Sequence, residues 1–152
     1  MPKIEIEAIE RKGGTGYPEP FRKLVEGRFR KRLGNAVGLT QFGVNLTTLA
    51  PGAATAHRHW HHNEDEFVYI LSGEATLVEN GGETILLAGD AAGFKAGVRN
   101  GHHIVNRSGS EVVLLEVGTR APVETAEYSD IDMRVEVDSR STRYTRKDGT
   151  PY

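Results

Sequence analysis

The chain has 152 residues, enough for a domain with its own core, and its 38% hydrophobic and 26% charged residues are typical of a globular protein. A formal net charge of −2 gives no overall attraction to nucleic acid or to an anionic membrane. The absence of cysteine excludes disulfides, thiolate nucleophiles and zinc-finger sites, and it is compatible with a reducing cytoplasm.

The N-terminal residues alternate apolar with charged side chains and lack the apolar stretch of a signal peptide. No apolar run in the sequence approaches the roughly 20 residues that a membrane helix needs. We therefore expect a soluble, cytoplasmic protein with neither a membrane nor a nucleic acid as its partner.

Short apolar runs separated by glycine-containing turns predict many short strands rather than long helices. Asn80-Gly81-Gly82 is a strong hairpin signal, because tight hairpin turns need residues at positive φ. The strands that we predict, each rich in β-branched or aromatic residues, cover residues 44–49, 66–71, 74–79, 83–87, 102–106 and 112–117. Strands at this spacing predict an all-β sandwich or barrel.

Two flanking segments differ from this predicted core. Residues 21–33 carry a basic cluster, whose members are Arg22, Lys23, Arg28, Arg30, Lys31 and Arg32. No DNA-binding motif accompanies it, so we interpret it as a solvated or subunit-contacting face rather than a nucleic-acid or phosphate patch. The tail, residues 119–152, is polar and of mixed charge, and we expect it to lie along the barrel or a partner subunit without chemistry of its own.

All six histidines fall in two short patches, residues 57–62 and 102–103. In a strand, residues i and i+2 share a face with side-chain roots about 7 Å apart, so His57, His59 and His61 project together. Two such imidazoles can bind one ion at roughly 2.0–2.2 Å. Glu66 opens the next predicted strand, which we expect to run back beside the first as a hairpin. Imidazoles with one carboxylate suit iron, manganese, nickel, zinc or copper better than magnesium or calcium.

These residues resemble the first motif of the cupin superfamily. His59, His61, Glu66 and Gly73 reproduce its histidine pair, four-residue gap, glutamate, six-residue gap and glycine. The sequence around these residues resembles that of a subgroup of largely uncharacterised bacterial single-domain cupins. It reads Arg-His-Trp-His at 58–61 and Glu-Asp-Glu-Phe at 64–67.

A second cupin motif is similar to the stretch from Gly89 through Gly97 and His102 to Asn106. The match departs from the usual pattern, because Lys95 stands where proline is expected and two extra residues precede His102. Asn106 fits the motif, but its alternative role is to bond the backbone.

Resemblance to this superfamily implies a double-stranded β-helix, or jelly roll, with a metal ion inside the barrel. We expect residues 1–152 to form one such domain, with its motif core at about 44–117 and irregular flanks at 1–43 and 118–152. The implied ligands are His59, His61, Glu66 and His102, holding one divalent transition metal ion (zinc, iron, manganese or nickel).

A rival register takes His57 and His59 as the pair and Glu64 as the carboxylate. It leaves eight residues before Gly73 instead of six, so we prefer the register above. In that register His57 lies on the ligand face, where it would orient a ligand or act as a general acid/base, and it is our candidate catalytic residue. The alternative is a solvent-facing histidine.

Fold alone does not determine function, since cupins include isomerases, dioxygenases, decarboxylases and binders. A metal with open positions would bind a small oxygenated metabolite, which favours an enzyme of sugar-phosphate isomerase or dioxygenase type. The alternative is a non-catalytic module that binds or senses a small molecule, and a purely structural metal is a weaker third.

Phe67 and Tyr69 alternate with the residues of the predicted inner face and therefore point outward. Aromatic side chains on an outer sheet face are typical of a covered surface, which predicts a homodimer.

Overall fold

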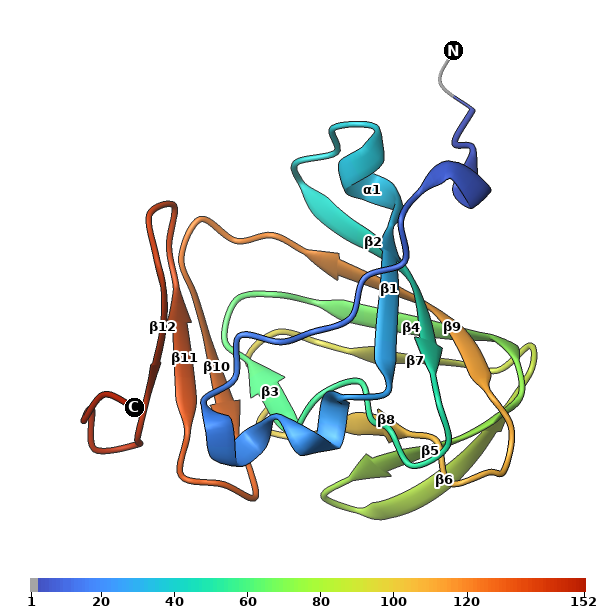
Figure 1. Cartoon of the computed structure of the whole chain (residues 1–152). Coiled ribbons are helices and arrows are strands. Elements are labelled where there is room, and N and C mark those ends of the chain that lie inside the picture. Colours follow the sequence, from blue (N-terminus) through green and yellow to red (C-terminus); the bar gives the residue numbers. More distant parts are fainter. Residues whose placement is uncertain (1–2) are drawn as a thin grey trace.

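The structure is a computed structural model that describes residues 3–152 (Figure 1). Its short helices are η1 (Ile6–Ala8), η2 (Glu19–Phe21), η3 (Lys23–Val25) and α1 (Leu33–Ala36). Its strands are β1 (Arg28–Arg32), β2 (Phe42–Leu49), β3 (His59–His61), β4 (Glu66–Ser72), β5 (Glu74–Glu79), β6 (Gly82–Leu87), β7 (Ala91–Phe94), β8 (His103–Val105), β9 (Val112–Thr119), β10 (Glu124–Tyr128), β11 (Arg134–Val137) and β12 (Thr142–Thr145). Within residues 3–152, no helix has the length and apolar character needed to cross a membrane.

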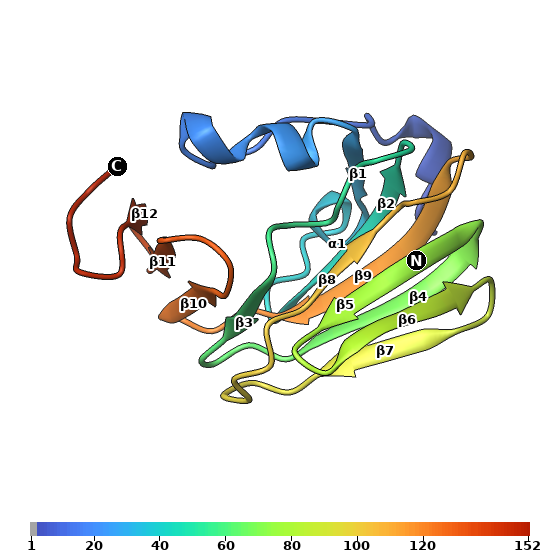
Figure 2. The same ribbon diagram turned by 90° about the horizontal axis from the view of Figure 1, so that it is seen from below.

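The strands form three antiparallel sheets, which Figure 2 shows from below. The five-stranded sheet has the order β1-β2-β9-β4-β7, the four-stranded sheet β12-β11-β10-β3, and the three-stranded sheet β6-β5-β8. This arrangement confirms the predicted all-β double-stranded β-helix. The flanks, which we expected to be irregular, contribute β1 and the three strands β10–β12.

The main core lies between the five-stranded and three-stranded sheets. Its largest fully buried side chains come from both: Leu49, Ile70, Val112 and Leu114 from the first and Ile104 from the second. A second apolar cluster attaches the N-terminal segment to the four-stranded sheet, and its members are Tyr17, Val25, Ala126, Tyr128, Met133 and Val135. The N-terminal segment is therefore part of the packed structure.

The turn between β4 and β5 requires a glycine at position 73, the last residue of the first motif. Gly73 has φ +87°, and a Cβ at this position would lie 2.8 Å from the carbonyl oxygen of Glu111. Both the left-handed backbone and the close approach exclude a side chain here.

The predicted hairpin between the first histidine patch and Glu66 is wrong. Strand β3 pairs with β10, whereas β4 pairs with β7 and β9. The four residues between β3 and β4 are enough for the chain to cross from one sheet to another, so sequence proximity does not produce pairing here. The tail, instead of lying passively along the barrel, supplies the strand that pairs with β3.

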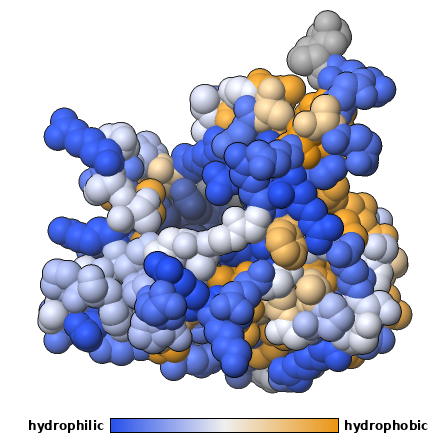
Figure 3. Space-filling view, in the orientation of Figure 1, coloured by the Kyte–Doolittle hydropathy of each residue, from blue (hydrophilic) through white to orange (hydrophobic). Residues whose placement is uncertain are grey.

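Strand parity in β4 follows the prediction. Val68 and Ile70 are buried, while Phe67 and Tyr69 are 42% and 37% exposed. Leu71 of β4 is also exposed, on the same face of the strand as Phe67 and Tyr69, and Ile85 and Leu87 of β6 are exposed apolar side chains of the three-stranded sheet. Figure 3 shows apolar surface along the right edge of the molecule.

The homodimer remains a prediction, which sedimentation equilibrium at micromolar concentration would test. The wild-type chain should sediment as a dimer, and Tyr69→Glu should shift it to monomer because the carboxylate would be desolvated at the interface. Val123→Glu, at an exposed apolar position before β10, should leave the dimer intact. A monomeric wild-type chain would refute the idea.

Candidate metal centre

Four side chains from three segments meet beside the two histidine patches. His59 and His61 are alternate residues of β3 and share a face, Glu66 is the first residue of β4, and His102 immediately precedes β8. An isolated backbone bridge, with hydrogen bonds of 3.2 and 2.9 Å, links His59 to His102. This bridge brings the second patch beside the first.

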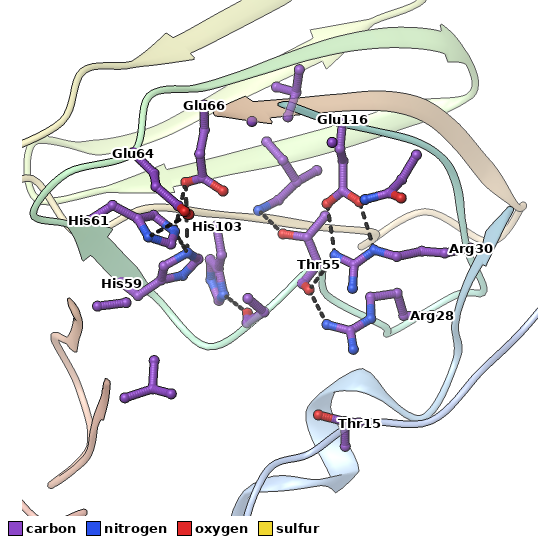
Figure 4. Close-up of a pocket in the computed structure, with 18 of the residues that line it drawn as sticks. Thr15, Arg28, Arg30, Thr55, His59, His61, Glu64, Glu66, His103 and Glu116 are labelled. Carbon is purple, nitrogen blue, oxygen red and sulfur yellow. Dashed lines mark hydrogen bonds and ion pairs between the residues drawn. The ribbon is translucent and has the colours of Figure 1, made fainter. Parts of the chain in front are cut away.

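Figure 4 shows His59, His61 and Glu66 pointing toward one another. Nε2 of His102 faces the same carboxylate oxygen of Glu66. The Nε2 atoms of His59 and His61 are 3.1 Å apart. Oε2 of Glu66 lies 2.8 Å from Nε2 of His102, and 3.4 and 3.7 Å from Nε2 of His61 and His59. His59, His61 and Glu66 thus place three ligand atoms within 4.8 Å of one another.

The opposite ring nitrogens determine the tautomers of these imidazoles. Nδ1 of His59 is 2.8 Å from the carbonyl oxygen of His57, and Nδ1 of His102 is 3.0 Å from that of Asn100. Because a carbonyl only accepts hydrogen bonds, each Nδ1 carries the proton and each Nε2 presents a lone pair.

Lone pairs on facing nitrogens, beside a carboxylate oxygen, repel one another unless a cation lies between them. The nitrogen and oxygen donors are those that divalent transition metals prefer. The residues present therefore fit such an ion, and the backbone carbonyls behind them are the outer partners that metal-binding histidines usually have.

Burial lowers the pKa of His59 to about 4, so this imidazole is neutral near pH 7. Burial alone would raise the pKa of Glu66, but the neighbouring His102 and His61 imidazoles hold it well below its usual value, because a proton taken up by this group binds an imidazole nitrogen rather than the carboxylate. Burial would likewise lower the pKa of His61, yet the carboxylates of Glu66 and Glu124 outweigh it and raise that pKa. A proton therefore competes with a metal ion more strongly at His61 than at His59.

Glu124 is a site residue that sequence analysis missed, since we expected no chemistry in the tail. This β10 carboxylate is only 3% exposed and accepts hydrogen bonds from the backbone N–H groups of His62 and Asn63, at 2.9 and 2.8 Å. Its Oε1 is also 3.4 Å from Nδ1 of His61, a buried nitrogen with no hydrogen bond within the described residues. Glu124 thus holds the crossing from β3 to β4 and favours the His61 tautomer with Nε2 free.

The four side chains line a cavity of about 500 Å³, and a second cavity of about 220 Å³ adjoins the same group. His61, Glu64, Glu66 and His102 line both. Figure 3 shows the hollow surrounded by hydrophilic surface. The larger cavity is of the size that small-molecule sites have.

The structure does not bring His57 to the other four residues. Its Nε2 is 2.8 Å from the carbonyl oxygen of Phe21, and its ring packs against those of Tyr17 and Phe21. It is not among the residues that line either cavity, so its acid/base role stays a prediction. Glu64, the carboxylate of the rival register, lies beside Nδ1 of His61 at 3.9 Å, away from the facing Nε2 atoms.

Asn106 bonds the backbone and not the histidine group. Its fully buried amide donates to the carbonyl oxygens of Leu49 and Ser110, at 2.9 and 2.7 Å. This second-motif residue therefore holds the loop after β8.

We predict that His61→Ala and His102→Ala remove most of the bound metal, because each deletes one donor of a small set. Metal content by mass spectrometry, on protein purified without added metal, would measure this, with circular dichroism to verify the fold. His62→Ala, whose ring stacks on Trp60, is the matched control and should retain the metal. Equal metal content in His61→Ala and His62→Ala would contradict the ligand assignment.

Glu124→Gln should weaken metal affinity by about 10–100-fold, the usual cost of removing an outer partner of a ligand. The reason is loss of the negative charge that orients His61. A competition titration with a chelating dye would measure the affinity. Glu127→Gln, in the same strand and paired at 3.4 Å with His62 instead, should leave it unchanged. Equal affinities in the two variants would exclude this role.

The model of the cupin domain matches residues 45–118 of the chain. No protein in the curated set compared with the chain matches it.

Two solved structures are similar over most of the chain. A cupin-superfamily protein from Silicibacter pomeroyi, described as a sugar phosphate isomerase, is 48% identical, with 99% of this chain and 96% of that chain covered and a TM-score of 0.97. A protein from Acidithiobacillus ferrooxidans, for which sugar phosphate isomerase activity has been suggested, is 30% identical, with 82% and 80% covered and a TM-score of 0.75.

A polyketide cyclase from Streptomyces resistomycificus shares the fold alone, at 19% identity, 78% and 79% coverage and a TM-score of 0.64. Because the motif residues, the sheet topology and the likeness to the Silicibacter pomeroyi structure agree, the chain belongs to the cupin superfamily.

Proposed function

We propose that the chain is a metal-dependent isomerase of a small sugar phosphate. The observation that carries this proposal is a facing set of imidazole and carboxylate donors, open to a cavity that a further carboxylate, Glu64, also lines. The 48% identity to the Silicibacter pomeroyi protein over nearly the whole chain supports the same activity.

His59, His61, Glu66 and His102 would hold one divalent transition metal ion. When bound, such an ion supplies Lewis-acid chemistry toward carbonyl and hydroxyl oxygens. The chain itself supplies orientation, because backbone carbonyls and Glu124 fix the imidazole planes before any ligand arrives.

Interconversion of an aldose and a ketose moves a proton between neighbouring carbons, so a base must reach the substrate. Glu64 meets the geometric requirement, since its carboxylate lines the cavity beside His61. A hydrogen bond of 2.8 Å from the backbone N–H of Ala121 to Oε1 orients this carboxylate. Oε2 would take the proton from the hydroxyl-bearing carbon and return it to the former carbonyl carbon, while the proton of that hydroxyl passes to the former carbonyl oxygen.

We expect the purified, metal-containing protein to interconvert an aldose phosphate with its ketose, and to exchange the transferred hydrogen with solvent deuterium. Glu64→Gln should lower turnover by about 10²–10⁴-fold, as the loss of a general base does, with metal content unchanged. Proton NMR of a panel of pentose and hexose phosphates in D2O measures both conversion and exchange.

His57→Gln completes this test, because the sequence predicted His57 as the acid/base. A large loss of turnover in His57→Gln and none in Glu64→Gln would transfer the role to His57. Ligand binding without turnover across the panel would favour the non-catalytic binding module. Oxygen uptake by an iron-containing protein would favour a dioxygenase.

A further inference from the structure

Strand β1 places three arginines on one face, because Arg28, Arg30 and Arg32 are alternate residues. All three line the cavity of about 500 Å³. The expectation that the basic segment forms a solvated or subunit-contacting face is therefore wrong for Arg28, which is buried, whereas Arg32 is exposed. In Figure 4, Arg28 and Arg30 lie across the cavity from His59 and His61.

Arg30 already has an anionic partner. Its Nε and Nη2 atoms donate to the two carboxylate oxygens of Glu116, at 2.8 and 3.0 Å. The Thr47 hydroxyl also donates to that carboxylate. The pair is therefore neutral as a unit and leaves no charge for a ligand.

Arg28 has no such partner. It is only 7% exposed, and its guanidinium donates to the carbonyl oxygens of Thr55 and Gly14, which carry no charge. Within residues 3–152 no carboxylate lies at ion-pair distance from it, although a guanidinium has five N–H groups and these two bonds use two. Burial and the neighbouring Arg30 lower the pKa of Arg28 to about 10, which still leaves it charged near pH 7.

The chain beside Arg28 leaves room for an anion. The glycine-rich segment 13–16 lines the same cavity and presents backbone rather than bulky side chains. Two backbone hydrogen bonds between Lys12 and Arg30, of 2.9 and 2.8 Å, hold this segment alongside β1. The mouth carries more positive charge, since Arg32 and Arg120 also line the cavity and form no ion pair within the described residues.

We propose that Arg28 binds the phosphate group of the substrate, in the half of the cavity opposite the histidine and glutamate group. This assignment rests on the proposed function for the identity of the substrate, but not for the existence of the anion site. A planar guanidinium with unused N–H groups matches two phosphate oxygens at once. The anion also neutralises a charge that the protein leaves buried and unpaired.

Isothermal titration of the protein as purified with inorganic phosphate tests the site directly. Arg28→Gln should weaken phosphate binding at least about tenfold, as expected for loss of a charged bidentate contact. Lys31→Gln is the matched control, since Lys31 lies on the other face of β1, bonds Ile6 and Glu7, and carries the same charge. Phosphate affinity unchanged in Arg28→Gln, or lowered equally in Lys31→Gln, would overturn the proposal.

A second variant covers the case in which Arg28→Gln fails to fold, because the side chain is buried. Arg28→Lys keeps the charge and loses the planar fork, so it should bind phosphate more weakly than wild type while melting as a folded protein. An affinity equal to that of wild type would argue against a guanidinium contact.

The titration must also distinguish phosphate bound at Arg28 from phosphate bound to a metal ion at the histidine and glutamate group. In His61→Ala, phosphate binding should persist, because Arg28 is intact. Loss of binding in His61→Ala, together with its retention in Arg28→Gln, would place phosphate on the metal and overturn the assignment. These titrations need no turnover, so a failed isomerase assay leaves their result intact. Ribose 5-phosphate should bind more tightly than ribose, and Arg28→Gln should remove that difference.

Discussion

Two backbone hydrogen bonds between His59 and His102 are the constraint on which the site depends. His59 begins β3 of the four-stranded sheet, and His102 directly precedes β8 of the three-stranded sheet. The bridge therefore joins two sheets at the position where both provide an imidazole. Glu66 completes the group from the five-stranded sheet, so the distances between these nitrogen and oxygen atoms depend on the relative position of all three sheets. Because the strands around them are packed, the geometry exists before any ion binds.

Periodicity accounts for what could be predicted of this group. Alternate residues of a strand share a face, which is enough to pair His59 with His61, and the motif spacing added Glu66 and His102. Short apolar runs also located six of the eight strands from β2 to β9 to within a few residues. Strand periodicity, motif spacing and apolar runs depend only on residues that are close in the sequence, so they can be recognised without the structure.

The features that were missed depend on contacts between distant segments. Glu124 lies 62 residues from His62, and nothing in an alternating polar segment distinguishes a buried carboxylate from an exposed one. The strands of the tail were overlooked for the same reason, since their solvent-facing residues are charged. The basic segment was misjudged because alternation on β1 sends its odd and even residues to opposite faces. His57 shares the parity of the ligands, yet the chain bends before β3 and its ring packs against Tyr17 and Phe21.

Charge is separated along the large cavity, and this separation favours one orientation of a charged ligand. Glu64 and Glu66 lie at one end with the imidazoles, while the unpaired guanidinium of Arg28 lies at the other, and the Arg30–Glu116 pair presents no net charge. A phosphate at the carboxylate end would meet two negative charges in a partly buried, weakly screened environment. At the arginine end it would meet a positive one. A sugar phosphate would therefore bind in one direction, with its phosphate toward Arg28 and its carbonyl end toward Glu64 and the histidine and glutamate group. Preorganised orientation of this kind lowers the entropic part of the barrier.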